Sequence, residues 1–244
     1  MRGYREDVAY IHDSGFTDFA RDAAPGLLDI LRRHGVRSGL VVDLGCGSGL
    51  WARELNRAGY EVQGVDQSLS MIRIARRVAP QASFRVASLA TVELPACHAI
   101  TSIGECLNYN FDQRNSRVEL RRLFRRAYSA LHPGGVFIFD IAEPHRIPQN
   151  PEKKWSEGPD WAILVSIEGE RARAMLRRRI VTFRRIRKAF RRSEETHLLR
   201  LYAADDLVTD LTRCGFRARK LKAYGRFQFP RGIAGILAVK PHLG

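Results

Sequence analysis

The sequence predicts an α/β domain whose parallel sheet is covered by helices on both faces and interrupted by an inserted antiparallel β-meander. Short apolar segments rich in β-branched residues alternate with amphipathic segments of helical spacing as far as Ala142. This alternation is typical of strands buried between two helical layers. Over residues 143–203 the alternation stops, and strand-like segments follow one another directly. A helix and two closing strands complete the chain.

Residues 1–34 are predicted to be helical, because apolar side chains recur at helical spacing between Phe16 and His34. Pro25 is expected to begin a second helix, since proline suits a first helical turn. Residues 35–142 then alternate between strands and helices. The predicted strands are 40–45, 61–66, 83–88, 96–103 and 134–142, and the predicted helices are 48–58, 68–78 and 115–131.

The insertion over residues 143–203 begins with a loop that contains two prolines. Three predicted strands follow, at 161–170, 174–186 and 191–202, and short turns between them indicate an antiparallel arrangement. Residues 204–244 carry a helix at 205–214 and two strands at 216–225 and 232–241, which we expect to pair antiparallel. The 244 residues are therefore predicted to form a single domain.

The composition is that of a globular chain, 45% hydrophobic and 27% charged. No apolar run approaches the roughly 20 residues that cross a bilayer, and the N-terminus lacks an apolar secretory segment. The four cysteines show neither a CxxC pair nor a histidine at metal-binding spacing. We therefore expect a cytoplasmic protein without a membrane partner, a disulfide framework or a metal site.

The net charge of +15 is unusual, and it is concentrated in the insertion. From Lys153 to Tyr202, 14 basic residues stand against six acidic ones. Such an excess keeps a nucleic-acid partner open as an alternative. A solvated strand face with charged edges explains the same arginines without any partner.

The segment VVDLGCGSG, residues 41–49, places a glycine-rich turn where a strand meets a helix. Open α/β sheets bind ligands at such turns, and glycines let the backbone approach a ligand closely. The spacing is GxGxG and not the GxGxxG of dinucleotide enzymes, and Asp43 precedes the first glycine. A carboxylate there would repel a pyrophosphate but suits a cation. S-adenosylmethionine carries an ammonium and a sulfonium and no phosphate, so it fits this charge pattern better than NAD.

A second acid, Asp66, ends the next predicted strand, 17 residues after Gly49. A carboxylate at this point can accept hydrogen bonds from both hydroxyl groups of a ribose. Capping of the following helix is the competing explanation for Asp66, although Ser68 already offers that cap. Ile103 and Gly104 end the fourth strand and are expected beneath the methionine arm of the ligand.

The sequence resembles the class I S-adenosylmethionine-dependent methyltransferases. The glycine motif with its acid, VDQS after the second strand and LHPGGVFIFD at the fifth occur in the family's order. The resemblance implies a Rossmann-like seven-stranded sheet with a reversed C-terminal strand pair. It also implies S-adenosylmethionine as cofactor. The implied contacts are Asp43, Gly45, Cys46, Gly47 and Gly49 to the methionine arm, Asp66 to the ribose, and Gln67, Met71, Ser88 and Leu89 around the adenine. Many relatives have an acid where this chain has Ser88.

Residues 1–34 resemble the lid that members of the family fold over the cofactor. The aromatic rings of Tyr10 and Phe16 would attract a sulfonium through cation–π interactions, and His12 lies between them in the sequence. A structural role of His12 in the helical region is the alternative.

Polar residues that could face the methyl acceptor occur in two places. Glu105, Asn108 and Tyr109 follow the fourth strand, and the segment THLLRLY contributes His197, Arg200 and Tyr202. A base is required only when the acceptor carries a proton, and we rank Glu105, His12 and His197, in that order, as catalytic candidates. Asn108, Tyr109, Arg200 and Tyr202 are candidates for substrate contact. Core packing explains Tyr109 equally well, and a solvated strand face explains the residues of THLLRLY nearly as well.

The predicted function is methyl transfer to a small-molecule acceptor by in-line displacement. Two alternatives remain open. The first is an RNA or DNA methyltransferase, favoured by charge but without an NPPY-like motif, a catalytic-cysteine motif or an RNA-binding module. The second is a cofactor-binding scaffold that has lost catalysis, against which the polar cluster around Glu105 argues. A homodimer is also compatible with the inserted strands.

Overall fold

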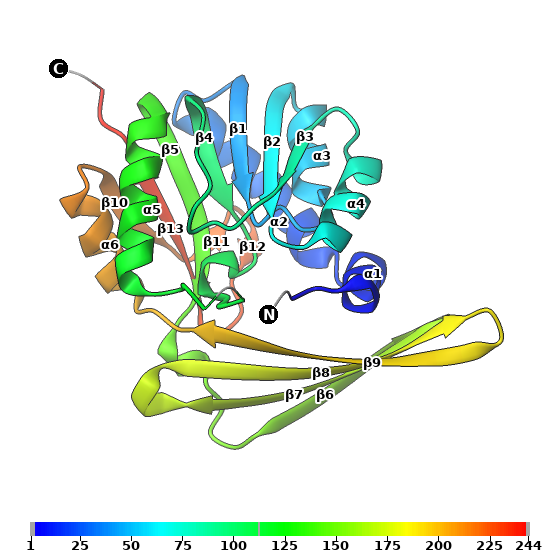
Figure 1. Ribbon diagram of the computed structural model, residues 1–244. Coiled ribbons are helices and arrows are strands. Elements are labelled where there is room, and N and C mark those ends of the chain that lie inside the picture. Colours follow the sequence, from blue (N-terminus) through cyan, green and yellow to red (C-terminus); the bar gives the residue numbers. More distant parts are fainter. Residues whose placement is uncertain (1–2, 112, 243–244) are drawn as a thin grey trace.

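The computed structural model describes residues 3–111 and 113–242 and shows a large twisted sheet above a smaller, separate sheet (Figure 1). The larger sheet has seven strands. In spatial order these are β10 (Arg217–Leu221), β13 (Ile233–Val239), β5 (Leu131–Ala142), β4 (Cys97–Ser102), β1 (Gly39–Leu44), β2 (Tyr60–Asp66) and β3 (Ser83–Val86).

Neighbouring strands from β5 to β3 are parallel, whereas β13 runs antiparallel to both β5 and β10. The reversed C-terminal strand pair and the predicted fold class are therefore confirmed. The chain leaves β1 toward β2 on one side, and it later returns to β4 on the other side. This reversal opens a crevice at the carboxyl ends of the strands, where ligands bind in such sheets.

Helices cover both faces of this sheet and bury two apolar cores. Side chains of β5 alternate between them: Phe137 and Phe139 pack against α5 (Arg117–Ala130), while Val136 and Ile138 belong to the core on the opposite face. The first core also includes α6 (Ala204–Arg213), and the second includes α2 (Asp18–Arg33), α3 (Leu50–Arg57) and α4 (Leu69–Val78). None of the described helices is both long and apolar enough to cross a membrane.

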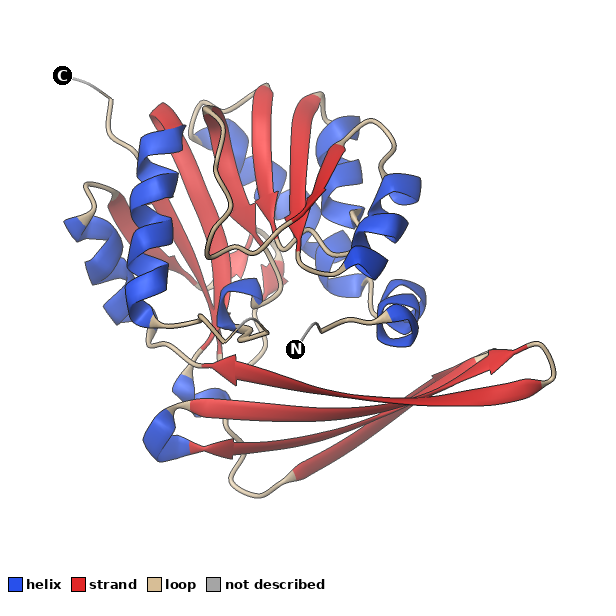
Figure 2. Cartoon of the chain, in the orientation of Figure 1, coloured by secondary structure: helices blue, strands red, loops and turns tan. Residues whose placement is uncertain are grey.

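The insertion forms a four-stranded antiparallel sheet, drawn below the larger sheet in Figure 2. Its strands are β6 (Glu152–Gly158), β7 (Trp161–Glu170), β8 (Met175–Ile186) and β9 (Ala189–Arg200). Its inner face packs against α1 (Glu6–Gly15), where Val8 and Ile11 contact a cluster that includes Trp161 and Ile180.

The structure differs from the predicted elements in three places. α1 is a separate helix before Phe16, and Pro25 lies inside the continuous α2 and does not begin a helix. The apolar face of α2 runs unbroken through this proline, which explains why the helix continues. The insertion contains a fourth strand, β6, which the sequence did not reveal because five of its seven residues are exposed and none is buried. A two-stranded hairpin, β11 (Ala223–Tyr224) and β12 (Phe227–Gln228), occupies the predicted closing loop.

Candidate active site

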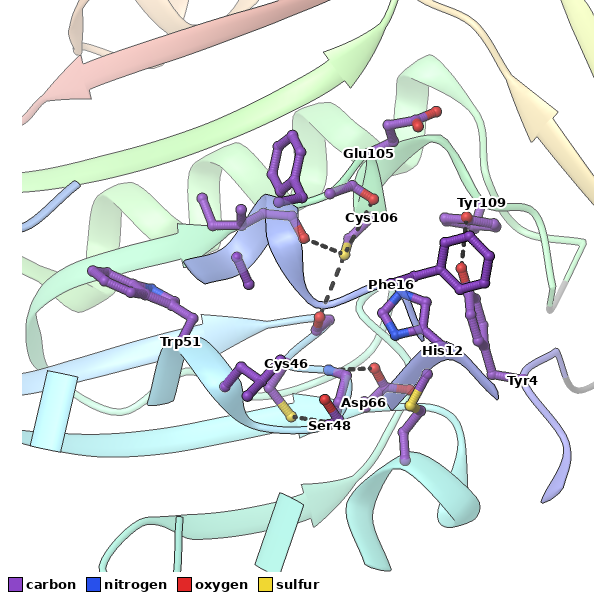
Figure 3. Close-up of a pocket in the computed structure, with 18 of the residues that line it drawn as sticks. Tyr4, His12, Phe16, Cys46, Ser48, Trp51, Asp66, Glu105, Cys106 and Tyr109 are labelled. Carbon is purple, nitrogen blue, oxygen red and sulfur yellow. Dashed lines mark hydrogen bonds between the residues drawn. The ribbon is translucent and has the colours of Figure 1, made fainter. Parts of the chain in front are cut away.

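A cavity of about 480 Å³ lies at the carboxyl ends of β1, β2 and β4. Both its position and its volume are those of small-molecule sites in open α/β folds. Figure 3 shows side chains of the N-terminal segment and of the loops after these strands converging on it. Most of the residues predicted for the site line this cavity: His12, Phe16, Asp43, Gly45, Cys46, Gly47, Asp66, Gln67, Met71, Leu89, Ile103, Gly104, Glu105 and Tyr109.

The glycine-rich turn between β1 and α3 presents bare backbone to the cavity. Gly45, Gly47 and Gly49 have φ angles of +78°, +51° and +80°, in the region that favours glycine. A Cβ placed on Gly47 would meet no other residue within 4 Å, so this part of the turn is open to a ligand. Gly49 instead faces α4, with 2.9 Å from a built Cβ to the Cα of Ala75. Gly49 therefore allows close helix packing, and its contact with a cofactor remains a prediction.

Asp66, at the end of β2, fixes the turn through its carboxylate. Its Oδ2 accepts the N–H of Gly47 at 3.0 Å, and its Oδ1 accepts the N–H of Ser68 at 2.8 Å. Burial raises the pKa of Asp66, and these backbone hydrogen bonds oppose the rise. Because a carboxylate oxygen can accept more than one hydrogen bond, Asp66 keeps capacity for ligand hydroxyl groups.

Asp43, at the end of β1, is buried beneath the turn. The hydroxyl of Thr101 donates to its Oδ1 at 2.8 Å, and the indole N–H of Trp51 donates to that hydroxyl at 3.1 Å. Burial raises the pKa of Asp43 to about 7. A ligand cation beside Asp43 would favour its ionised form, so the residue suits an ammonium group.

Asp140, on β5, holds the loop that follows β4, a role the sequence analysis missed. Its carboxylate accepts the N–H groups of Gly104 at 3.0 Å and of Glu105 at 2.7 Å, and the hydroxyl of Tyr224 donates to it at 3.1 Å. Burial raises the pKa of Asp140 to about 7. Glu105 has a φ of +60°, which is disfavoured for a residue with a side chain. Asp140 therefore stabilises a strained backbone at the Glu105 side of the cavity.

Glu105 is in turn held by an arginine of the inserted sheet. Nη2 of Arg178, on β8, contacts both carboxylate oxygens of Glu105 at 2.9 and 3.2 Å. Nη1 donates to the hydroxyl of Tyr109 at 3.1 Å, and that hydroxyl shares a 2.9 Å hydrogen bond with the hydroxyl of Tyr4. Burial opposes the charge of Arg178, but Tyr109 and Glu105 outweigh it and raise the pKa of Arg178. A continuous polar chain thus joins the insertion to the N-terminal segment.

The N-terminal segment lies against the cavity and is anchored to α4. The carbonyl of Tyr4 accepts the hydroxyl of Ser68 at 2.6 Å, and the same hydroxyl oxygen caps α4 by accepting the N–H of Met71 at 3.1 Å. Burial lowers the pKa of His12, so its imidazole is neutral near pH 7. Nδ1 of His12 is buried and has no hydrogen-bond partner within the described part of the chain. Figure 3 shows this ring between Phe16 and Asp66.

Three of the candidates for substrate contact lie outside the cavity lining: Asn108, Arg200 and Tyr202. Asn108 donates to the carbonyls of Ala142 at 3.0 Å and Arg200 at 2.7 Å, and it accepts the N–H of Ala142. Arg200 donates to the carbonyl of Asn115 at 3.1 Å, and the hydroxyl of Tyr202 bonds to the Asn115 side chain. These contacts fasten the loop after β4 to its neighbours, and a substrate contact of these residues remains a prediction.

Tyr10, Ser88 and His197 also lie outside the lining. The hydroxyl of Tyr10 donates to Asp160 at 2.7 Å, on the side of α1 that meets the inserted sheet. Ser88 lines a smaller adjoining cavity of about 50 Å³ that also includes residues 67 and 89. His197 is buried and bonds through Nε2 to Glu195 at 2.9 Å. The cofactor roles of Tyr10 and Ser88 and the catalytic role of His197 remain predictions.

Asp43→Asn tests whether burial keeps the Asp43 carboxyl neutral. The folded-state pKa of about 7 exceeds the usual value near 4, so the wild type loses stability as pH rises between these values, by about 1.4 kcal/mol per pKa unit. Asparagine does not titrate. We therefore compare the free energies of unfolding of the variant and the wild type by urea titration at several pH values. The value for the variant minus the value for the wild type should rise from about pH 4 to about pH 7. A constant difference over this interval would show that Asp43 ionises freely in the folded chain.

Comparison with known proteins agrees with this geometry. Residues 41–135 match the family described as "Methyltransferase domain". A dTDP-3-amino-3,6-dideoxy-alpha-D-glucopyranose N,N-dimethyltransferase of Streptomyces fradiae is 26% identical over 57% of this chain and 52% of its own length. A ubiquinone biosynthesis O-methyltransferase of Brucella ovis is 33% identical over 54% of this chain and 49% of its own length. The chain thus spans about half the length of these curated relatives.

The fold as a whole has a solved counterpart. The structure of an S-adenosylmethionine-dependent methyltransferase from Clostridium acetobutylicum aligns with a TM-score of 0.81 at 19% identity and covers 96% of this chain and 98% of the other. The alignment extends the similarity in fold beyond residues 41–135 to the insertion and the terminal segments. Residues 41–135 of this chain therefore match a methyltransferase domain, in agreement with the resemblance of the sequence to the class I family, and the fold over nearly the whole chain is that of a solved methyltransferase.

Proposed function

We propose that the chain transfers a methyl group from S-adenosylmethionine to a small-molecule acceptor. One observation carries the proposal: the turn at Gly45–Gly47 and Asp66 face the same cavity as Glu105, Tyr109 and Arg178. One end of the cavity thus combines open backbone with carboxylates, and the other end is lined by aromatic and paired polar groups. An amino-sugar methyltransferase among the relatives supports a small acceptor.

The cofactor end suits S-adenosylmethionine, which supplies a methyl group activated by a sulfonium. Asp43 would pair with the ammonium group, and Asp66 would accept the ribose hydroxyls. Gln67 and Met71 lie on the Asp66 side of the same cavity and would flank the adenine. The open backbone at Gly47 leaves room for this contact without displacing a side chain.

The acceptor end would orient a nucleophile and exclude water, and orientation of this kind can supply roughly 7–11 kcal/mol. The carboxylate of Glu105 is already paired with Arg178, so Glu105 is suited to positioning the acceptor. His12 is suited to taking a proton, because its imidazole is neutral and the buried Nδ1 lacks a partner among the described residues. We therefore rank His12 ahead of Glu105 as the candidate base, and His197 lies outside the cavity lining.

The basic charge of the insertion gives the nucleic-acid alternative little support. Much of it is paired with acids: Arg177 with Glu168, Arg179 and Arg192 with Glu194, and Arg191 with Asp7. These pairs fit a charged strand face better than a phosphate-binding surface. A cofactor-binding scaffold that has lost catalysis would not need the polar chain around Glu105, so this polar chain argues against the scaffold alternative. A cytoplasmic location and a homodimer remain predictions.

Calorimetric titration tests the class of ligand. S-adenosylhomocysteine, the demethylated product, should release or absorb heat with a stoichiometry of one ligand for each chain, and NAD should give none. Heat with NAD and none with S-adenosylhomocysteine at millimolar concentration would contradict the proposal.

Asp66→Ala should weaken binding of S-adenosylhomocysteine, because it removes charge-assisted hydrogen bonds to the ribose. The expected loss is roughly 1.5–3 kcal/mol, about 10- to 150-fold in Kd. Asp29→Ala, which removes a partly exposed acid of α2, serves as the control. Equal affinities of the Asp66 variant and the wild type would refute the ribose contact.

His12→Gln should lower the rate of methyl transfer by roughly 10²- to 10⁴-fold when the acceptor carries a proton. Affinity for S-adenosylhomocysteine should stay within about threefold of wild type, since glutamine keeps a polar side chain there. An acceptor from a panel of amines and hydroxyl compounds, detected by mass spectrometry, provides the assay. His145→Gln changes an exposed histidine and is the control. Unchanged kcat at all pH values would exclude His12 as the base.

A further inference from the structure

The outer strand of the inserted sheet, β6, presents an open edge. It pairs with β7 on one side, and no described strand pairs with its other side. Figure 1 shows β6 as the strand of this sheet farthest from the seven-stranded sheet. Open edges of this kind leave backbone N–H and C=O groups available for pairing with another chain.

An unusually exposed aromatic side chain sits in the middle of this strand. Trp155 is 72% exposed, more than any other large hydrophobic side chain in the described ranges. Leu164 of β7 lies directly opposite it and is 47% exposed. Together they form an apolar patch on the outer face, next to the open edge. Charged and polar side chains protect many open strand edges, but an exposed tryptophan at this position offers no such protection.

The charges of β6 are only partly satisfied within the chain. Lys154 pairs with Glu152 at 2.9 Å. Lys153 and Glu157 form no ion pair with any described residue, although they carry opposite charges and share the face of Trp155. They are four residues apart, which is about 13 Å along a strand. They are therefore too distant to pair within one copy.

We propose that β6 pairs antiparallel with β6 of a second copy of this chain, with Trp155 opposite its own counterpart. In this register Lys153 lies opposite Glu157 of the second copy, and the two-fold symmetry makes this pair twice. Centring the pairing on Lys153 or Lys154 would place like charges opposite each other, which destabilises a sheet. The two inserted sheets would then form one continuous sheet, in which both open edges are closed.

This interface uses no residue of the cavity, so it stands independently of the proposed methyl transfer. The same interface also accounts for the exposure of Trp155 and for the charges of Lys153 and Glu157. The exposed positions on β6 can be changed without disturbing either core, because none of them belongs to a buried cluster.

Charge reversal on β6 tests the pairing, with the dimer dissociation constant measured by sedimentation equilibrium of the full chain. The wild type should dimerise. Lys153→Glu and Glu157→Lys should each weaken the dimer at least about tenfold, because each places two like pairs in the interface. The double variant exchanges both signs and should return to within about threefold of wild type. Lys154→Glu makes the same charge change as Lys153→Glu on the other face of the strand and should have the smaller effect.

Three results would overturn the proposal. If the wild type stays monomeric up to about 100 µM, the proposed pairing of the seven residues of β6 with those of a second copy is excluded. A dimer that neither single reversal nor Trp155→Ser weakens would place the interface elsewhere. Weakening by both single variants without recovery in the double variant would show that Lys153 and Glu157 do not face each other. Circular dichroism of each variant separates these results from a loss of folding.

Discussion

Carboxylates buried at the ends of parallel strands hold the loops of the candidate active site in place. Asp66 accepts the N–H of Gly47, and Asp140 accepts the N–H groups of Gly104 and Glu105. Each hydrogen bond to a charged group contributes roughly 1.5–3 kcal/mol, which offsets part of the cost of burial. Asp140 accepts the N–H of Glu105, whose backbone is left-handed, while the carbonyl of Glu105 accepts the N–H of Asn108. The shape of the cavity therefore depends both on Asp66, which lines it, and on Asp140, which lies outside its lining.

The inserted sheet connects this site with the molecular surface. Residues alternate between the two faces of a strand, so neighbouring positions on β8 point in opposite directions. Arg178 faces inward and binds Glu105, whereas Arg177 and Arg179 face outward and pair with acids of the neighbouring strands. One short arginine run thus contributes both to the cavity, through the contact of Arg178 with Glu105, and to the outer surface.

The sequence was sufficient where the chemistry is local. The turn with Asp43 and the acid at Asp66 are each set by a few consecutive residues between a strand and a helix, so their placement could be predicted. The contact of Arg178 with Glu105 joins positions 73 residues apart. Which arginine of the run faces inward depends on strand register, which no local pattern determines. Asp140 was visible as an acid in an apolar strand, but its partners are backbone groups of a distant loop.

A crystal structure with bound S-adenosylhomocysteine would test the central claim most directly. The account predicts the ribose hydroxyls within about 3.2 Å of the Asp66 carboxylate, with the amino-acid end of the ligand beside Gly45 and Asp43. Glu105 and His12 would then border the space in front of the sulfur. A ligand bound elsewhere, or a glycine turn that closes the cavity to it, would contradict the account.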